Sequence, residues 1–210
     1  VTQKGKGYAI AEQNKEAFHW TMPFDLEIGK PKEEEHGPTY AGTIANYLME
    51  QIKVDPTVVA INAGTPGGFG FTPEWRKAAG KQYIDVGIAE EHAIAMSSGI
   101  AKNGGKPVFN VYSTFLQRTY DQLVQDLCVN NNSAVIINHM ASIYGMNDVT
   151  HLGFFDIPLL TSIPNLVYLA PTNNEELLAM TEYAVHHQEH PVAHRVPVGE
   201  FTTTGVADTT

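Results

Sequence analysis

Six short apolar runs, separated by segments of helical periodicity, constrain the fold of this chain more than any other feature. They lie at residues 57–62, 83–86, 107–112, 134–138, 166–170 and 192–196. Strands buried on both faces are continuously apolar, and strands that alternate with helices form βαβ units with a parallel sheet. The pattern therefore predicts an α/β fold: a doubly wound, mainly parallel six-stranded sheet with helices on both faces.

The segments between the runs have the spacing of amphipathic helices. Helical patterns cover residues 72–79, 90–103, 114–129 and 174–188. Another helix is expected after the capping residue Thr39, because Ile44, Leu48 and Ile52 recur at helical intervals.

The flanking segments indicate where the folded domain begins and ends. Residues 27–38 contain Gly, Pro, Lys and three consecutive glutamates, and such a segment buries no apolar surface. We therefore expect a linker at 27–38, a domain at 39–200, and a polar linker beginning at 201–210. Because the sequence starts at Val1 without a methionine, we expect a piece of a longer polypeptide or a processed product.

Composition disfavours several classes of partner. The formal net charge is −10 and no run of Lys or Arg exceeds two residues, which argues against nucleic acid and anionic membrane surfaces. No stretch approaches the roughly 20 apolar residues of a membrane span. The single cysteine, Cys128, fits a reducing compartment, so a cytoplasmic location is predicted.

Glu90 is the first candidate for chemistry. It follows the apolar run 83–86 where a helix opens, and open α/β sheets bind ligands at the carboxyl ends of their strands. Taken alone, a first-turn acid more often complements the helix dipole, an interaction of about 0.3–1 kcal/mol. Glu90, Glu91 and His92 cannot share one helix face, so one acid should face the strand ends and the other water.

Two other strand-end segments carry candidate residues. Phe115 and Arg118 follow the run 107–112, although Phe115 also has ordinary core spacing. His151 lies in an irregular loop, residues 145–153, after the run 134–138. Because parallel strands end at one edge of a sheet, these segments and Glu90 should meet at one rim, which favours a functional site.

Two further patterns do not predict sites. The glycine-rich segment 62–70 lacks the spacing of a dinucleotide loop, and Pro66 has no amide to offer a phosphate. His186 and His190 are four residues apart, but no acidic or cysteine ligand stands nearby to complete a metal site. We predict no metal ligands in this chain.

Three longer strings resemble those of the 1-deoxy-D-xylulose-5-phosphate synthase family, which are thiamine diphosphate enzymes of the transketolase superfamily. DVGIAEEH, residues 85–92, is similar to the family motif D-V-x-I-A-E-Q-H, and YSTFLQR, residues 112–118, is the family string unaltered. KGKGYAIAE, residues 4–12, resembles the end of the family's first domain. Gly145, Thr150-His151, Gly153 and Phe155-Asp156 keep the frame of the next motif.

The resemblance covers nearly the whole chain and implies a domain assignment. Residues 1–26 would be the tail of a diphosphate-binding domain, and 39–200 a pyrimidine-binding domain. No G-D-G motif occurs in the chain, so the Mg²⁺ and diphosphate site is expected in a missing domain. The family also implies a homodimer of the full-length protein, and an isolated chain that is inactive.

The resemblance further implies roles for individual residues. In the family a glutamate hydrogen-bonds a ring nitrogen of the cofactor's aminopyrimidine, and Glu90 holds that position, whereas Glu91 stands where the family usually has glutamine. Further implied cofactor-binding residues are Phe115, Arg118 and Tyr8. The implied catalytic residues are Glu90, His151 and His19, and the implied substrate pocket contains Tyr112, His92, Asn147 and Arg195.

The implied reaction decarboxylates pyruvate and condenses its two-carbon unit with glyceraldehyde 3-phosphate, for isoprenoid precursor synthesis. Met140 and Val198 replace two arginines that bind the acceptor phosphate in the family, and Asn147 replaces an aspartate. Neither Met nor Val can form a bidentate contact to phosphate. Two alternatives to the implied reaction therefore remain. The chain could belong to a paralogous enzyme with another aldehyde acceptor, or it could be a non-catalytic assembly domain.

Overall fold

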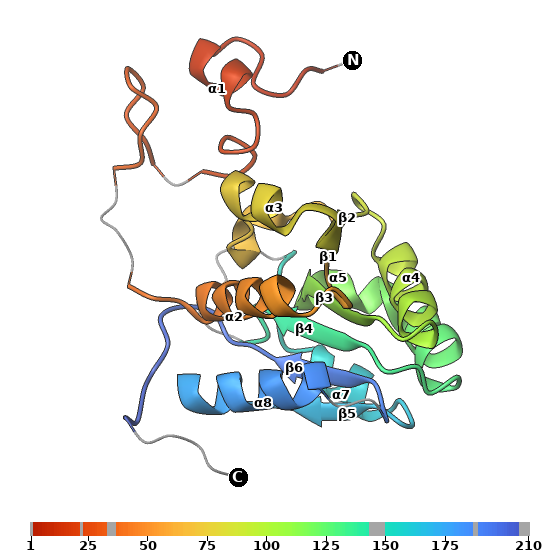
Figure 1. Ribbon diagram of the computed structural model, residues 1–210. Coiled ribbons are helices and arrows are strands. Elements are labelled where there is room, and N and C mark those ends of the chain that lie inside the picture. Colours follow the sequence, from red (N-terminus) through yellow and green to blue (C-terminus); the bar gives the residue numbers. More distant parts are fainter. Residues whose placement is uncertain (1, 22, 33–36, 143–149, 187–188, 206–210) are drawn as a thin grey trace. The chain divides into compact units, whose positions relative to one another are not determined.

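A computed structural model describes residues 2–21, 23–32, 37–142, 150–186 and 189–205. The chain divides into two compact units, Val1–Gly37 and Pro38–Thr210 (Figure 1). The boundary falls inside the range where the sequence predicts a linker.

The second unit is built on one sheet. In the described residues, six strands pair in the order β2-β1-β3-β4-β6-β5, and every pair is parallel. The strands are β1 (Val58–Asn62), β2 (Tyr83–Asp85), β3 (Lys106–Tyr112), β4 (Val135–His139), β5 (Val167–Leu169) and β6 (Val192–Arg195). The doubly wound six-stranded fold predicted from the sequence is confirmed, and the sheet is parallel throughout.

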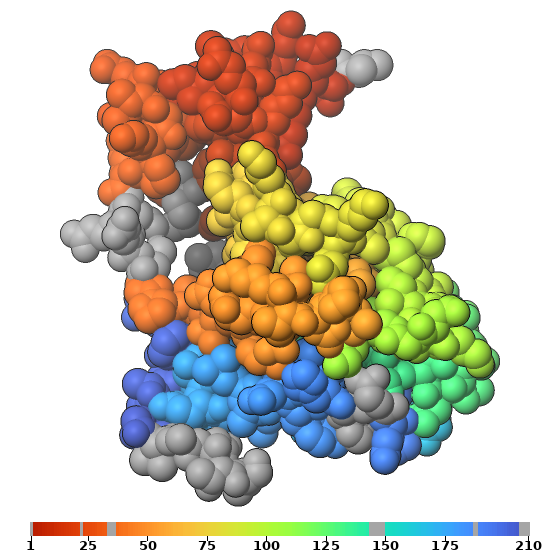
Figure 2. Space-filling view, in the orientation of Figure 1, coloured from red at the N-terminus to blue at the C-terminus, as the bar shows by residue number. Residues whose placement is uncertain are grey.

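Helices cover both faces of this sheet. They are α2 (Tyr40–Val54), α3 (Pro73–Ala79), α4 (Glu90–Lys102), α5 (Ser113–Leu116), α6 (Tyr120–Gln122), α7 (Asp156–Thr161) and α8 (Asn174–His186). α2 and α8 lie side by side at the surface of one face (Figures 1 and 2). One core lies under α2, α3 and α8, and a second core lies under α4 and α7 on the opposite face.

Alternating side chains of each strand supply these two cores. In β4, Val135 and Ile137 belong to the first core and Ile136 to the second. Most positions of β1, β3, β4 and β6 are buried, which explains why the sequence shows continuous apolar runs at these strands.

The helix expected at residues 114–129 is not one regular α-helix. α5 passes into a 3₁₀ turn at Gln117–Thr119, and α6 passes into a π-helical turn at Leu123–Cys128. The buried hydroxyl of Thr119 donates to the carbonyl of Leu116 at 2.8 Å, an interaction that competes with helical hydrogen bonding. The prediction of a single helix is therefore wrong in its regularity.

The strand order places a switch point between β1 and β3. α3, which follows β1, packs on the first core, whereas α5, which follows β3, packs on the second. Connections that leave neighbouring strands toward opposite faces open a crevice at the strands' carboxyl ends, the usual place for a ligand.

The first unit has its own small cluster. The rings of Tyr8, Phe18 and Phe24 lie 5.1–5.9 Å apart, and α1 (Ala9–Gln13) follows Tyr8. Asp25 accepts hydrogen bonds from the amides of Glu27 and Ile28. The beginning of the predicted linker therefore forms a hydrogen-bonded turn within this unit.

No helix in the described ranges combines the length and apolarity that crossing a bilayer requires.

Two histidines are buried within the sheet. His139 is 3% and His194 0% exposed. Burial lowers the pKa of His139 to about 3, with a contribution from His194, and burial lowers the pKa of His194 to about 4. Both imidazoles are therefore neutral in the folded chain at pH 7.

Because these two histidines are buried and neutral, we expect the folded chain to lose stability in acid. As pH falls below 6.5, the unfolded chain binds two protons that the folded chain does not bind, so stability declines until pH reaches the folded pKa values. At pH 5 the loss should be roughly 2 kcal/mol per histidine. Urea unfolding at pH 7 and pH 5 gives the change in the free energy of unfolding between the two pH values. This change should be smaller in His194→Gln, and it should stay the same in His186→Gln, where the histidine is exposed. If wild type and His194→Gln showed the same change, the low pKa of His194 would be contradicted.

Candidate active site

Asp85 fixes the loops from which the site is built. Its carboxylate accepts hydrogen bonds from the amide of Gly64 at 3.0 Å, the amide of Gly87 at 2.8 Å and the side chain of Asn62 at 3.1 Å. The loops after β1 and β2 are thereby tied together, and α4 begins three residues after Gly87.

Glu90 opens α4 and is almost fully buried, with 2% of its surface exposed. Its Oε2 lies 3.2 Å from Nη1 of Arg118, close enough for an ion pair. Within the described residues, however, no donor is aligned for a hydrogen bond to this oxygen. A buried carboxylate oxygen without a hydrogen bond is uncommon in folded proteins and points to a group that binds there.

Arg118 connects the two neighbouring acids. Its Nε donates to Oε1 of Glu91 at 2.9 Å while Nη1 faces Glu90. The pKa of Glu91 is lowered by a hydrogen bond from its own backbone amide and by Arg118. Glu91 is partly exposed while Glu90 is buried, so the two acids face different surroundings, as helical spacing predicts.

A row of aromatic rings crosses the loops after β1, β3 and β4. Ring centroids lie 4.7 Å apart for Phe69 and Tyr112, 5.9 Å for Tyr112 and Phe115, and 5.3 Å for Phe115 and His151. A Cβ at Gly68 would lie 1.6 Å from the Tyr112 hydroxyl, so this close approach requires glycine. Burial raises the pKa of Tyr112.

The segment 113–119 brings these two groups of residues together. Phe115 contributes to the aromatic row and Arg118 pairs with Glu90, and both follow directly from the end of β3. The structure therefore places Glu90, Arg118, Phe115, Tyr112 and His151 at the carboxyl edge of the sheet, around the switch point.

Arg195 lies in a separate buried network. Its Nε is 3.0 Å from Oδ2 of Asp156, and the same oxygen accepts from Asn138 at 3.1 Å and from the hydroxyl of Tyr168 at 2.5 Å. Nη2 of Arg195 donates to the carbonyl of Gly153 at 3.3 Å. Arg195 therefore holds the β4–α7 connection.

Gly153 explains why this connection is tight. A Cβ there would lie 1.7 Å from the backbone oxygen of Met140. Met140 itself has a positive φ of 54°, in the region that side chains rarely adopt.

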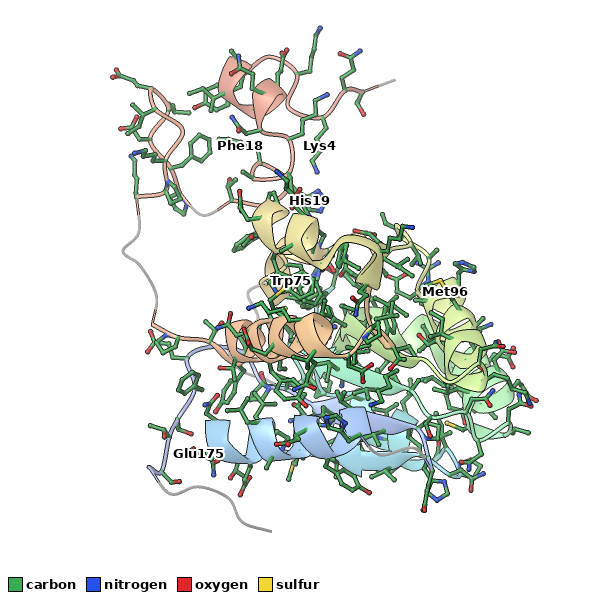
Figure 3. All side chains as sticks on the ribbon, in the orientation of Figure 1. Lys4, Phe18, His19, Trp75, Met96 and Glu175 are labelled. Carbon is green, nitrogen blue, oxygen red and sulfur yellow. The ribbon has the colours of Figure 1, made fainter. Side chains whose placement is uncertain are left out.

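The remaining candidate residues are described by their local surroundings. His92 is exposed on α4. Tyr8 and His19 belong to the first unit, where the Tyr8 hydroxyl donates to the carbonyl of Leu26 and His19 Nδ1 lies 2.8 Å from Lys4 Nζ (Figure 3). Asn147 lies outside the described residues.

Sequence reasoning assigned no role to several residues that shape the site: Asp85, Thr114, Asp156 and Tyr168. Asp85 lies next to the end of the predicted strand 83–86, a position from which a role could have been predicted. The contact between Asp156 and Tyr168 forms because α7 and β5 lie next to each other in the folded domain. No local sequence pattern predicts this contact.

Among the residues that the structure describes, no group of three or more His, Cys, Asp and Glu side chains could hold a metal ion.

Fold and site together define a doubly wound α/β domain of the class that binds ligands at the carboxyl edge of a parallel sheet. Residues 36–203 match the family described as transketolase, pyrimidine binding domain. The chain belongs to this family of thiamine diphosphate-binding proteins.

Curated relatives extend the similarity over most of the chain. The 1-deoxy-D-xylulose-5-phosphate synthase of Natranaerobius thermophilus is 41% identical over 201 residues, covering 95% of this chain and 32% of the relative. The synthase of that name from Heliobacterium modesticaldum is 42% identical over 199 residues, covering 95% of this chain and 30% of the relative. The chain thus spans about a third of the length of these relatives.

Solved structures share the fold. A transketolase from Leishmania mexicana superposes with a TM-score of 0.66 at 15% identity, covering 83% of this chain and 28% of that chain. A split-gene transketolase, described as an inactive β4 tetramer, has a TM-score of 0.65 at 19% identity, covering 82% of this chain and 56% of that chain.

Proposed function

We propose that this chain is the pyrimidine-binding part of a thiamine diphosphate-dependent transferase of the 1-deoxy-D-xylulose-5-phosphate synthase type. The whole enzyme would decarboxylate pyruvate and condense the two-carbon unit with glyceraldehyde 3-phosphate, in isoprenoid precursor synthesis. The names of the curated relatives support this reaction. The proposal includes a diphosphate-binding domain with Mg²⁺ outside this chain, a homodimer, a cytoplasmic location and an inactive isolated chain.

The observation that carries the proposal is the buried carboxylate of Glu90. Its Oε2 lacks a hydrogen bond from the described residues, and Glu90 opens α4 shortly after the carboxyl end of β2. An N–H of an aminopyrimidine ring is the complementary group, because an ionised carboxylate is an acceptor only. The residues present therefore fit the cofactor.

Thiamine diphosphate, when bound, supplies a nucleophilic carbon that attacks the carbonyl of an α-keto acid. Glu90 accepts a hydrogen bond at Oε2 and so holds the pyrimidine in the tautomer that relays a proton. Phe115 offers its ring for stacking, and Arg118 balances the charge of Glu90. The aromatic row keeps water from this part of the crevice.

The substrate side is formed by the remaining candidates. His151 exchanges a proton with the carbonyl group of the bound substrate, and Tyr112 and His92 line the proposed substrate pocket. The family pattern also assigns a cofactor contact to Tyr8 and a second proton exchange to His19. These roles extend the residue pattern of the family to this chain.

One observation favours a different acceptor as the second candidate function. Met140 and Val198 offer no cation, and Arg195 is engaged by Asp156 and by the carbonyl of Gly153. A phosphate would have to compete with a buried carboxylate for Arg195. An aldehyde without a phosphate group is therefore the alternative acceptor.

A non-catalytic assembly domain is less well supported. Assembly requires the sheet and its covering helices, but it does not require a buried acid whose Oε2 lacks a hydrogen bond. Glu90 and the aromatic row therefore favour the enzyme.

The proposed function is tested by pyruvate consumption in the full-length protein. We expect consumption only when thiamine diphosphate and a divalent cation are both present. Supplying glyceraldehyde 3-phosphate or unphosphorylated aldehydes in parallel then separates the two candidate acceptors. No consumption of pyruvate with any acceptor would overturn the enzymatic proposal.

A further inference from the structure

His151 is tied to its own neighbour in the chain. The hydroxyl oxygen of Thr150 lies 2.9 Å from Nδ1 of His151, a hydrogen-bond distance. A threonine hydroxyl both donates and accepts hydrogen bonds, so it can bond Nδ1 in either tautomer of a neutral imidazole. The hydroxyl of Thr150 therefore fixes the direction in which the ring of His151 faces.

Thr150 is in turn held by the segment that follows β3. The hydroxyl of Thr114 donates to the backbone carbonyl of Thr150 at 2.8 Å. Phe115, the next residue of α5, packs against the ring of His151, with centroids 5.3 Å apart and planes inclined at 71°. Two adjacent residues of α5 thus contact two adjacent residues of the β4–α7 connection.

The same connection is fixed a few residues later. Arg195 donates to the carbonyl of Gly153, and Gly153 packs directly on the backbone of Met140. His151 therefore stands on a short segment that is anchored on both sides, by α5 and by β6.

We propose that Thr150 and Thr114 are positioning residues for His151: Thr150 sets the orientation of the imidazole, and Thr114 holds the backbone that carries it. The inference deepens the proposed function, on which its catalytic consequence rests, because it explains how the ring of His151 is held in one orientation for proton exchange. Neither threonine contacts the substrate in this assignment.

Valine tests the hydroxyl of each threonine without changing the shape of the side chain. Thr150→Val cannot hydrogen-bond Nδ1, whereas Thr150→Ser keeps the hydroxyl. In the full-length protein, Thr150→Val should lower kcat for pyruvate about tenfold, a fraction of what general acid–base catalysis contributes, and KM should stay within about twofold. Thr150→Ser should restore most of the activity.

Thr114→Val and Thr114→Ser form a second pair with the same expected order. Thr161→Val is the matched control, because its hydroxyl donates to the carbonyl of Ile157 on the surface of α7. This control should leave kcat unchanged. The pH profile of kcat should shift in Thr150→Val but not in Thr161→Val, which a merely structural effect would not produce.

A second readout does not depend on activity. In full-length protein with ¹⁵N-labelled histidines, the His151 signals can be identified by their absence from His151→Gln. We expect the Nδ1 signal of His151 to agree between wild type and Thr150→Ser, and to shift in Thr150→Val, where the hydrogen bond to Nδ1 is lost. An unchanged Nδ1 signal in Thr150→Val would overturn the inference.

The two readouts keep the two proposals apart. If wild type consumes no pyruvate, the proposed function fails, while the ¹⁵N measurement of His151 still decides the role of Thr150. If wild type is active and Thr150→Val matches it in kcat and in pH profile, the positioning role is refuted even though the proposed function stands.

Discussion

Replacing Glu90 with glutamine in the full-length protein is expected to lower pyruvate turnover by about 10²–10⁴-fold, the range that a positioned proton-transfer group contributes. Glutamine matches glutamate in shape, so the buried site should keep its packing. Its neutral amide places no negative charge next to the ring nitrogen of the cofactor, and it cannot exchange a proton with that nitrogen. Steady-state measurement of pyruvate consumption at saturating thiamine diphosphate gives the ratio.

Glu91→Gln is the matched control for this substitution. Glu91 is the next residue of α4, pairs with the same Arg118, and is partly exposed. Its replacement removes a comparable charge from the same helix turn, so a general effect of charge should be similar in both variants. We expect less than a tenfold change for Glu91→Gln. If the two variants lost activity equally, Glu90 would have no specific role.

The second large effect is expected at Asp156, whose replacement with asparagine should destabilise the fold by about 3–5 kcal/mol. The carboxylate is fully buried, forms an ion pair with Arg195 at 3.0 Å, and accepts from Tyr168 and Asn138. Removing its charge leaves a largely buried guanidinium without its partner. Urea unfolding of the chain measures the loss.

A double variant shows whether the loss comes from the pair. In Asp156→Asn combined with Arg195→Gln, no uncompensated charge remains, so the destabilisation should be well below the sum of the single changes. Asp121→Asn, on the exposed surface of α6, should change stability by no more than about 0.5 kcal/mol. Strict additivity of the two buried substitutions would contradict the coupling.

Much of the fold could be predicted from the sequence, because the apolar runs of the strands and the helical spacing of apolar residues are both local patterns. The strands begin and end within a residue or two of the apolar runs, and the strands β1, β3, β4 and β6 are largely buried on both faces. α7 was not predicted, because a six-residue helix that contains Pro158 is too short to show a repeat. The break near Thr119 was also missed, because it depends on the direction of one hydroxyl.

The site was predictable to a lesser extent. Glu90, Phe115, Arg118 and His151 all follow strands, so a parallel sheet is enough to gather them at one edge. The pairing of Arg195 with Asp156 depends on residues 39 positions apart that meet only in the folded sheet. The sequence interpretation assigned Arg195 only to the substrate pocket and did not foresee its contacts with Asp156 and with the carbonyl of Gly153.

The hydrogen bonds that Asp85 accepts from Asn62, Gly64 and Gly87 have a consequence for mutational scanning. None of these three partners is proposed for chemistry, yet the carboxylate joins the loops after β1 and β2 shortly before α4 begins. In a scan that substitutes each residue in turn, substitutions at Asp85 should reduce activity as severely as those at Glu90, and more than those at other exposed acids. If every residue that tolerates no substitution were taken to contact the ligand, Asp85 would be wrongly assigned as a catalytic carboxylate.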